Sequence, residues 1–144
     1  MRNIWQRLTG WWKGRKALPE NLAHGRSGEK AAKRHLQKLG LKYLTRNFRG
    51  KRGEIDLVFR DGDCLVFVEV KARSMDSWTR PAAAVDKGKR MRLTHTAFEY
   101  LRLLKAPPVK IRFDVVEVVL QGDAVDEVRH LPNAFPMSAP FRYG

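Results

Sequence analysis

The sequence of 144 residues predicts an α/β fold, a mixed β-sheet flanked by helices in the order α-β-β-β-α-β-β. Three observations support this fold class. Apolar residues recur at helical spacing in two separate segments. Between and after these segments, short apolar or alternating runs are bounded by glycine, proline and aspartate, as strands are. Tight connections join the first three runs, which indicates an antiparallel meander that feeds a crossover helix.

The first helix is expected over residues 26–39. Ala32, Leu36 and Leu39 share one face of it, and Gly40 follows where a helix commonly ends. Lysines and arginines occupy much of the remaining surface.

Three strands are expected next, at residues 41–48, 54–60 and 64–71. The basic turn GKRG at 50–53 joins the first to the second. Asp61-Gly62 marks a hairpin turn between the second and the third. The third, CLVFVEVK, is an apolar run of the kind that a central strand buries on both faces.

The second helix is expected over residues 82–104, stopped by Pro107-Pro108. Two further strands follow at 109–120 and 125–131. The proline-rich tail, residues 132–144, is expected to be irregular.

The charge is large and unevenly distributed. The chain has 29 Lys plus Arg against 15 Asp plus Glu, a formal net charge of +14. Residues 1–53 hold 15 basic and 2 acidic side chains, whereas residues 54–144 hold 14 and 13. A basic excess of this size indicates a polyanionic partner, above all nucleic acid.

Other features narrow the class of protein. The single cysteine, Cys64, excludes an internal disulfide and a Cys-based zinc site. No stretch reaches the roughly 20 apolar residues of a spanning helix, and the basic N-terminus does not resemble a secretory signal. We therefore expect a cytoplasmic protein. Residues 1–16 carry three tryptophans and five positive charges. This pattern predicts a basic amphipathic helix that contacts a membrane surface or nucleic acid. Alternatively, the tryptophans pack against the domain.

Carboxylates are concentrated on two neighbouring strands. Glu54 and Asp56 share one face of the second strand, and Glu69 and Lys71 share one face of the third. If Asp61 and Gly62 form the turn, Asp56 lies opposite Phe67 and diagonal to Glu69. A buried, ionised Glu69 needs a cation or a metal beside it.

Two interpretations of this acidic group remain open. Two convergent carboxylates with a nearby lysine suit a hard divalent cation such as Mg²⁺, which takes its remaining ligands from water and phosphate. Alternatively, Lys71 forms a structural ion pair with Glu69 or Asp56.

The sequence also shows a resemblance to a known protein family. Residues 25–74, which run from GRSGEKAAKRHL to EVKARS, resemble the YraN-type family of small bacterial proteins. The resemblance continues through AAAVDKGKRMRL and RFDVVEV to about residue 135. It implies a restriction-endonuclease-like, PD-(D/E)xK fold, similar to archaeal Holliday junction resolvases. A nuclease-like domain would then span residues 24–135, between a basic, Trp-rich extension at 1–23 and an irregular tail at 136–144.

The resemblance also implies roles for individual residues. Asp56 in GEID would be the first metal-binding acid of the nuclease pattern, although Ile55 replaces the proline that often precedes it. Glu69 and Lys71 in EVK would be the second acid and the lysine. The carbonyl of Val70 would be an additional metal ligand, and the metal would be Mg²⁺ or Mn²⁺.

Two further acids have two interpretations each. Glu29 matches the acid that such nucleases add from the N-terminal helix, or it is a helix N-terminal acid stabilised by the macrodipole. Glu54 would be a third ligand, or it pairs with Arg49, Lys51 or Arg52.

Basic residues around the acids suit contacts with phosphate. Lys87, at the start of the second helix, would lie beside the site as in resolvase-like relatives. Arg49, Arg52 and Arg73 flank the acidic strands and suit backbone contacts that do not read sequence.

The leading hypothesis is therefore a metal-dependent nuclease acting on DNA, with structured or branched DNA as the expected substrate. Its rivals are a non-catalytic nucleic-acid-binding module of the same fold and a peripheral membrane protein dominated by residues 1–16. A junction resolvase would act as a homodimer, because its two cuts are related by two-fold symmetry.

Overall fold

A computed structural model describes residues 23–75 and 85–143 of the chain. Within these residues the chain forms two helices and a five-stranded sheet. The expected helix at residues 1–16 lies outside the described part. The elements, in chain order, are α2 (Ala23–Lys38), β1 (Lys42–Arg49), β2 (Glu54–Asp61), β3 (Cys64–Ser74), α3 (Lys87–Leu103), β4 (Lys110–Gln121) and β5 (Ala124–Phe135).

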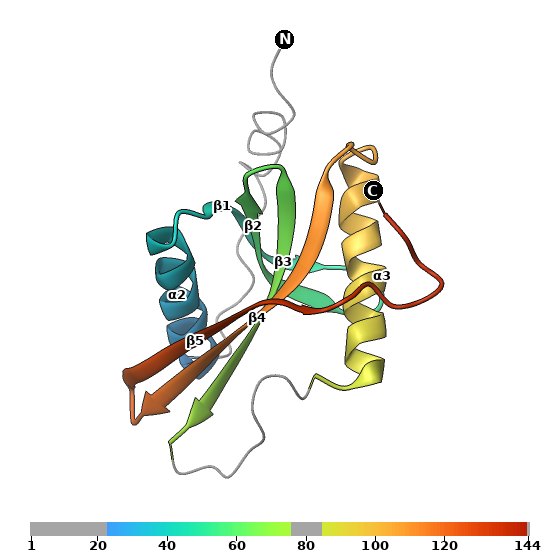
Figure 1. The fold of residues 1–144 in the computed structure, drawn as a ribbon. Helices are drawn as coiled ribbons and strands as arrows, with labels where there is room; N and C mark the ends of the chain where they lie inside the picture. The colour runs from blue at the N-terminus through green and yellow to red at the C-terminus, as the bar shows by residue number, and fades with distance from the viewer. Residues whose placement is uncertain (1–22, 76–84, 144) are drawn as a thin grey trace.

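The sheet is mixed, and its strands lie in sequence order from β1 to β5. β1, β2 and β3 form an antiparallel meander. α3 then carries the chain across one face of the sheet, so that β4 pairs parallel with β3 (Figure 1). β5 returns antiparallel to β4 at the far edge. The predicted fold class and element order are thus confirmed.

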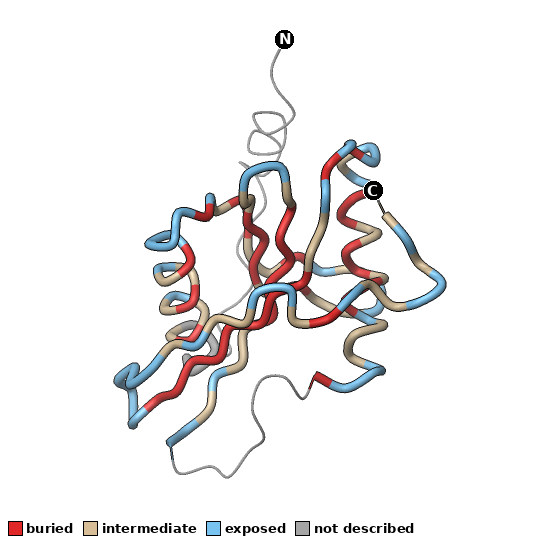
Figure 2. Tube along the Cα trace, viewed as in Figure 1, coloured by how far each residue is buried: buried red, intermediate tan, exposed pale blue. Residues whose placement is uncertain are grey.

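The two helices cover opposite faces of the sheet (Figure 1). Each face has its own apolar core. The α3 core includes Phe67 and Tyr100, whose rings meet edge to face, and the α2 core includes Leu36 and Val68. Figure 2 shows the central strands buried along most of their length, with exposed residues at the turns. Burial of both faces explains the apolar runs at residues 65–68 of β3 and 118–120 of β4.

Three local expectations differ from the structure. The hairpin turn is Gly62-Asp63, because Asp61 pairs with Cys64, and the positive φ of Gly62 (59°) fits a type II′ turn. α3 begins at Lys87, since Asp86 is extended and caps it. β5 continues to Phe135, four residues further than expected.

The described tail after Phe135 packs on α3. The backbone N–H of Ser138 donates to the Thr94 hydroxyl at 3.1 Å, and Phe141 lies edge-on to His95. No helix in the described residues is long and apolar enough to cross a membrane.

Candidate metal-dependent nuclease site

The site lies where β2 and β3 separate. The two strands pair from Asp61↔Cys64 to Leu57↔Val68, while β3 continues beside β4 as far as Ser74. Val58, not Asp56, is opposite Phe67, so the expected diagonal arrangement is wrong. The register is shifted because the turn sits one residue later. Continued by one residue, this register brings Asp56 directly opposite Glu69, which is closer than predicted.

The two carboxylates form a buried acid pair. Glu69 is 8% exposed, and among the described residues its Oε2 has no hydrogen-bond donor. Burial raises the pKa of Asp56 well above its usual range, and the facing Glu69 carboxylate raises it further. The backbone N–H of Val70 opposes this rise by donating to Asp56 Oδ2 at 2.8 Å. A proton or a cation is needed to hold two such groups together.

Glu29 approaches the pair from α2. Its charge also raises the pKa of Asp56, which places it in the same electrostatic site. Close packing brings α2 to β3 here, because a Cβ at Gly28 would lie 3.0 Å from the Cβ of Ala72. Glu29 is the seventh residue of α2, beyond the first turn where the macrodipole favours acids. The alternative role as a helix N-terminal acid therefore does not fit.

Asn47 links the outer acids. Its φ of 53° kinks β1, a conformation that asparagine tolerates better than most residues. With its amide nitrogen turned toward the carboxylates, Asn47 donates to Glu29 Oε1 and to Glu54 Oε1, each at 3.2 Å. Glu54 also contacts Arg49, Nε to Oε2, at 3.4 Å. Glu54 is thus engaged at the rim of the site by Asn47 and Arg49.

The basic residue beside the acid pair is Lys89, not Lys87. Lys89 Nζ lies 3.3 Å from Glu69 Oε1, whereas Lys87 is exposed. The helix phase decides this difference, since residues two apart point to different sides of a helix. Asp86 sets the phase by accepting the backbone N–H of Lys89 at 2.8 Å, a bond that lowers the pKa of Asp86.

Lys71 and Val70 lie next to Glu69 on β3. Lys71 follows Glu69 on the same face of β3, is half-buried, and is near enough to Asp86 to lower its pKa. No hydrogen bond or ion pair within the described residues involves the Lys71 ammonium. The N–H and C=O of one strand residue point to the same edge, so the Val70 carbonyl faces the side on which its N–H meets Asp56.

The three expected phosphate-binding arginines lie in different surroundings. Arg49 is exposed at the end of β1, beside Glu54. Arg52 is exposed in the β1–β2 turn, with Nη1 3.1 Å from His95 Nε2. Arg73 is held by the buried Glu117, Nε to Oε1, at 2.6 Å, and is therefore not presented to a ligand.

Sequence reasoning missed Lys89 and Asn47. If Asp86 is recognised as the N-cap of the helix, Lys89 follows as the lysine of the first turn that faces the sheet. For Asn47, the signal was an asparagine inside an expected strand, since asparagine is a residue type enriched at positive φ.

The residues at the fork fit a divalent cation. The raised pKa of Asp56, and the Glu69 Oε2 that has no donor among the described residues, mark a site whose negative charge is incompletely compensated. No group of three or more His, Cys, Asp or Glu side chains in the described chain converges as a complete metal cage. Mg²⁺ does not require one, because it binds through one or two carboxylates and keeps waters or phosphate oxygens.

A five-stranded mixed sheet between two helices, with two acids and a lysine at the β2–β3 fork, defines the restriction-endonuclease-like class of fold. Within it, the model of the uncharacterised protein family UPF0102 matches residues 28–118. The chain belongs to this family.

Relatives from several bacteria support the assignment. A UPF0102 protein of Solibacter usitatus is 44% identical over 123 residues, which cover 84% of this chain and 90% of that protein. One of Dechloromonas aromatica is 42% identical over 115 residues, covering 80% and 92%. One of Syntrophus aciditrophicus is 36% identical over 121 residues, covering 84% and 94%. The expected family membership is confirmed.

Proposed function

We propose that the protein is a Mg²⁺- or Mn²⁺-dependent nuclease that hydrolyses phosphodiester bonds in DNA, with branched or structured DNA as its substrate. The acid pair supports this proposal more than any other observation. Asp56 and Glu69 lie together at a strand fork. Asp56 has a raised pKa, and one Glu69 oxygen has no donor among the residues that the structure describes. Such a pair binds phosphate only when a cation lies between them, since two carboxylates repel it.

Each residue of the fork has a role in this proposal. Asp56, Glu69 and the Val70 carbonyl would hold the metal, and Glu29 would orient its waters. A divalent cation bound there polarises a phosphoryl oxygen and lowers the pKa of a bound water. Lys71 would position the attacking water or neutralise charge that builds on the phosphorus oxygens.

The surroundings suit a polyanionic substrate. Without a metal, Lys89 Nζ lies 3.3 Å from Glu69 Oε1 and compensates its charge. With a metal bound to Glu69, the Lys89 ammonium would be free to turn toward a phosphate. A DNA substrate would also place the protein in the cytoplasm, as the sequence predicts.

The test is cleavage of single-stranded, duplex, flapped and four-way-junction DNA in Mg²⁺, Mn²⁺ or chelator. Wild type is compared with Asp56→Asn and Lys71→Met, and the matched controls are Asp63→Asn and Lys110→Met, an exposed pair at the opposite end of the β2–β3 hairpin. We expect metal-dependent cleavage that Asp56→Asn and Lys71→Met abolish and the controls retain. Cleavage that survives Asp56→Asn would refute the site.

A non-catalytic binding module is the second candidate. The observation in its favour is the Lys89–Glu69 contact, which supplies a countercharge without any metal. This module would bind DNA in chelator, with an affinity that falls steeply with salt, and Asp56→Asn would leave binding unchanged. Binding without metal-dependent cleavage on all four substrates would establish it.

A further inference from the structure

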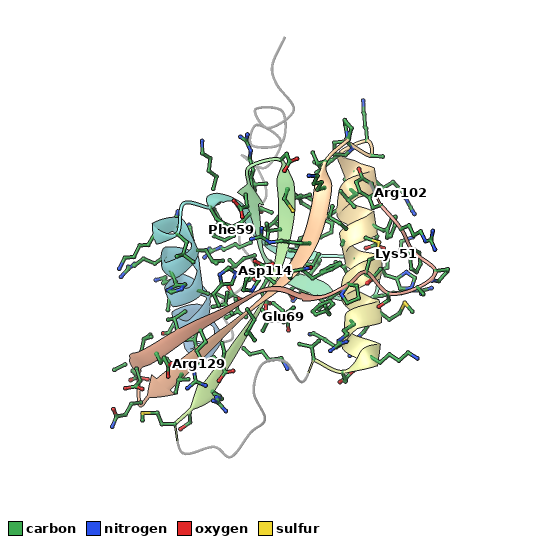
Figure 3. All side chains as sticks on the ribbon, viewed as in Figure 1. Lys51, Phe59, Glu69, Arg102, Asp114 and Arg129 are labelled. Carbon is green, nitrogen blue, oxygen red and sulfur yellow. The ribbon has the colours of Figure 1, made fainter. Side chains whose placement is uncertain are left out.

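A basic groove lies between the β1–β2 turn and the C-terminal half of α3. Its volume is about 500 Å³. Three cationic side chains that line it, Arg49, Lys51 and Arg102, are all exposed, and Lys51 and Arg102 both lie on the α3 side of the molecule (Figure 3). Leu103, 45% exposed, adds an apolar edge. The groove therefore combines a positive wall with a small apolar surface.

The one carboxylate in the groove lining, Glu99, holds the turn in place. Its Oε2 accepts the backbone N–H of Lys51 at 2.9 Å. Gly50 passes so close that a Cβ there would collide with the same oxygen. Three cations against this one carboxylate leave the lining with a net positive charge.

One face of α3 spans the distance between this groove and the acid pair, and the β1–β2 turn covers its middle. Lys89, Arg92, Thr96, Glu99 and Leu103 follow one another at spacings of three or four residues, so they share one face of the helix. Lys89 meets Glu69 at one end of this face. In the middle, the β1–β2 turn packs on the helix, since a Cβ at Gly53 would lie 3.3 Å from Thr96 Oγ1.

The length of this face sets the distance between groove and site. At 1.5 Å per residue, the helix rises about 20 Å between Lys89 and Arg102. A duplex that lies parallel to α3 over the β1–β2 turn would cover roughly six base pairs in that distance, at 3.4 Å per pair.

We infer that this groove binds the sugar-phosphate backbone of the DNA about six base pairs to one side of the cut. The inference rests on the proposed nuclease function. Charge complementarity commits the groove to phosphate. Arg49 lines the groove and also contacts Glu54 at the rim of the acid site, which commits the groove to the same DNA molecule. The groove gives affinity and alignment through phosphate contacts, which by themselves carry no base-sequence information.

The test is the salt dependence of duplex binding in chelator, measured by fluorescence anisotropy on the full chain. The variant is Lys51→Gln/Arg102→Gln, which removes two charges without touching the acid pair. We expect the slope of log K against log salt to fall by about two, one for each lost phosphate contact. The matched control, Lys42→Gln/Lys110→Gln, removes two exposed charges at the Asp61–Cys64 end of the sheet and should leave the slope nearly unchanged.

Phosphate-ethylation interference gives the position of the contact. Wild type should show a block of interference about six base pairs from the cleaved bond, and the groove variant should lose it. An unchanged slope in the groove variant would overturn the inference even if the protein cleaves DNA. A reduced slope with no metal-dependent cleavage would support the groove and refute the nuclease. The groove variant is also tested for binding to polyglutamate, which stands in for an acidic protein partner. If the variant loses polyglutamate binding while its duplex binding is unchanged, the groove binds an acidic protein and the inference is overturned.

Discussion

Lys89 Nζ lies 3.3 Å from Glu69 Oε1, so the first turn of α3 contacts the acid at the fork of β2 and β3. In the absence of a metal this ammonium is the positive charge nearest to the buried acid in the described structure. The same contact joins α3 to β3, the strand that carries Glu69.

We predict that Lys89→Gln binds Mn²⁺ more tightly and cleaves DNA more slowly. Removing a positive charge a few ångströms from a divalent cation favours metal binding by about 1 kcal/mol, or roughly fivefold. The same change removes a group available to a phosphate. Isothermal titration with Mn²⁺ measures the first effect and single-turnover cleavage the second. Lys87→Gln, an exposed neighbour, is the control, and a metal affinity lowered by Lys89→Gln would contradict the prediction.

Asp56 should make the metal-free protein less stable as the pH rises. Its pKa is raised in the folded state by burial and by Glu69, so the folded protein binds more protons than the unfolded chain. The free energy of unfolding therefore falls as the pH rises from the unfolded pKa, about 3.9, through the raised folded value.

Urea unfolding in chelator between pH 4 and pH 8 tests this expectation. The difference in stability between Asp56→Asn and wild type should grow with pH in favour of the variant, because asparagine keeps the bond from Val70 and removes the charge. Mg²⁺ at pH 8 should stabilise wild type and leave Asp56→Asn unchanged. Asp63→Asn, at an exposed turn, should show neither behaviour. A difference that shrinks with pH would contradict the assigned direction of the pKa.

Asn47 should have separable contributions from its backbone and its amide. Asn47→Ala loses both the tolerated positive φ and the donor to Glu29 and Glu54, whereas Asn47→Gly loses only the donor. We expect Asn47→Ala to be less stable than Asn47→Gly by about 1 kcal/mol, the cost of a β-carbon in the left-handed region. Thermal unfolding of the two variants measures this difference. Equal stabilities would show that the kink relaxes without cost.

Arg73 should contribute to stability, and not to DNA binding. Arg73→Met removes the closer of the two guanidinium contacts of the Glu117 carboxylate, which is 2% exposed, and keeps the Arg129 contact at 3.6 Å, so we expect a loss of about 2 kcal/mol. Arg73→Met/Glu117→Met should recover much of that loss, because both charges are then removed. Arg49→Met, at an exposed ion pair, should cost less than about 0.5 kcal/mol. Weaker DNA binding by Arg73→Met at unchanged stability would favour the phosphate contact.

Local patterns predicted most of the elements because periodicity is a property of the chain itself. The alternation in residues 54–60 and the helical spacing of Leu36 with Ala32 each match an element of the structure. The acids of the site were also identifiable, since Glu69 stands alone in an apolar strand and needs a partner wherever that strand is buried.

The exact contacts depended on features that adjacent residues do not determine. Asp61-Gly62 and Gly62-Asp63 are both credible turns in sequence, and the structure uses the second, which places Val58 instead of Asp56 opposite Phe67. A shift of this kind changes every cross-strand neighbour, because side chains alternate between the two faces.

By itself, the sequence determined the order of helices and strands, the placement of the acids on two neighbouring strands, and the basic excess. The tertiary structure alone decided that Lys89 and not Lys87 meets Glu69, and that Arg73 is held by Glu117. Spacing along the chain sets which residues share a face of one element. How two elements meet is set by the packing of their buried faces, which joins residues far apart in the chain.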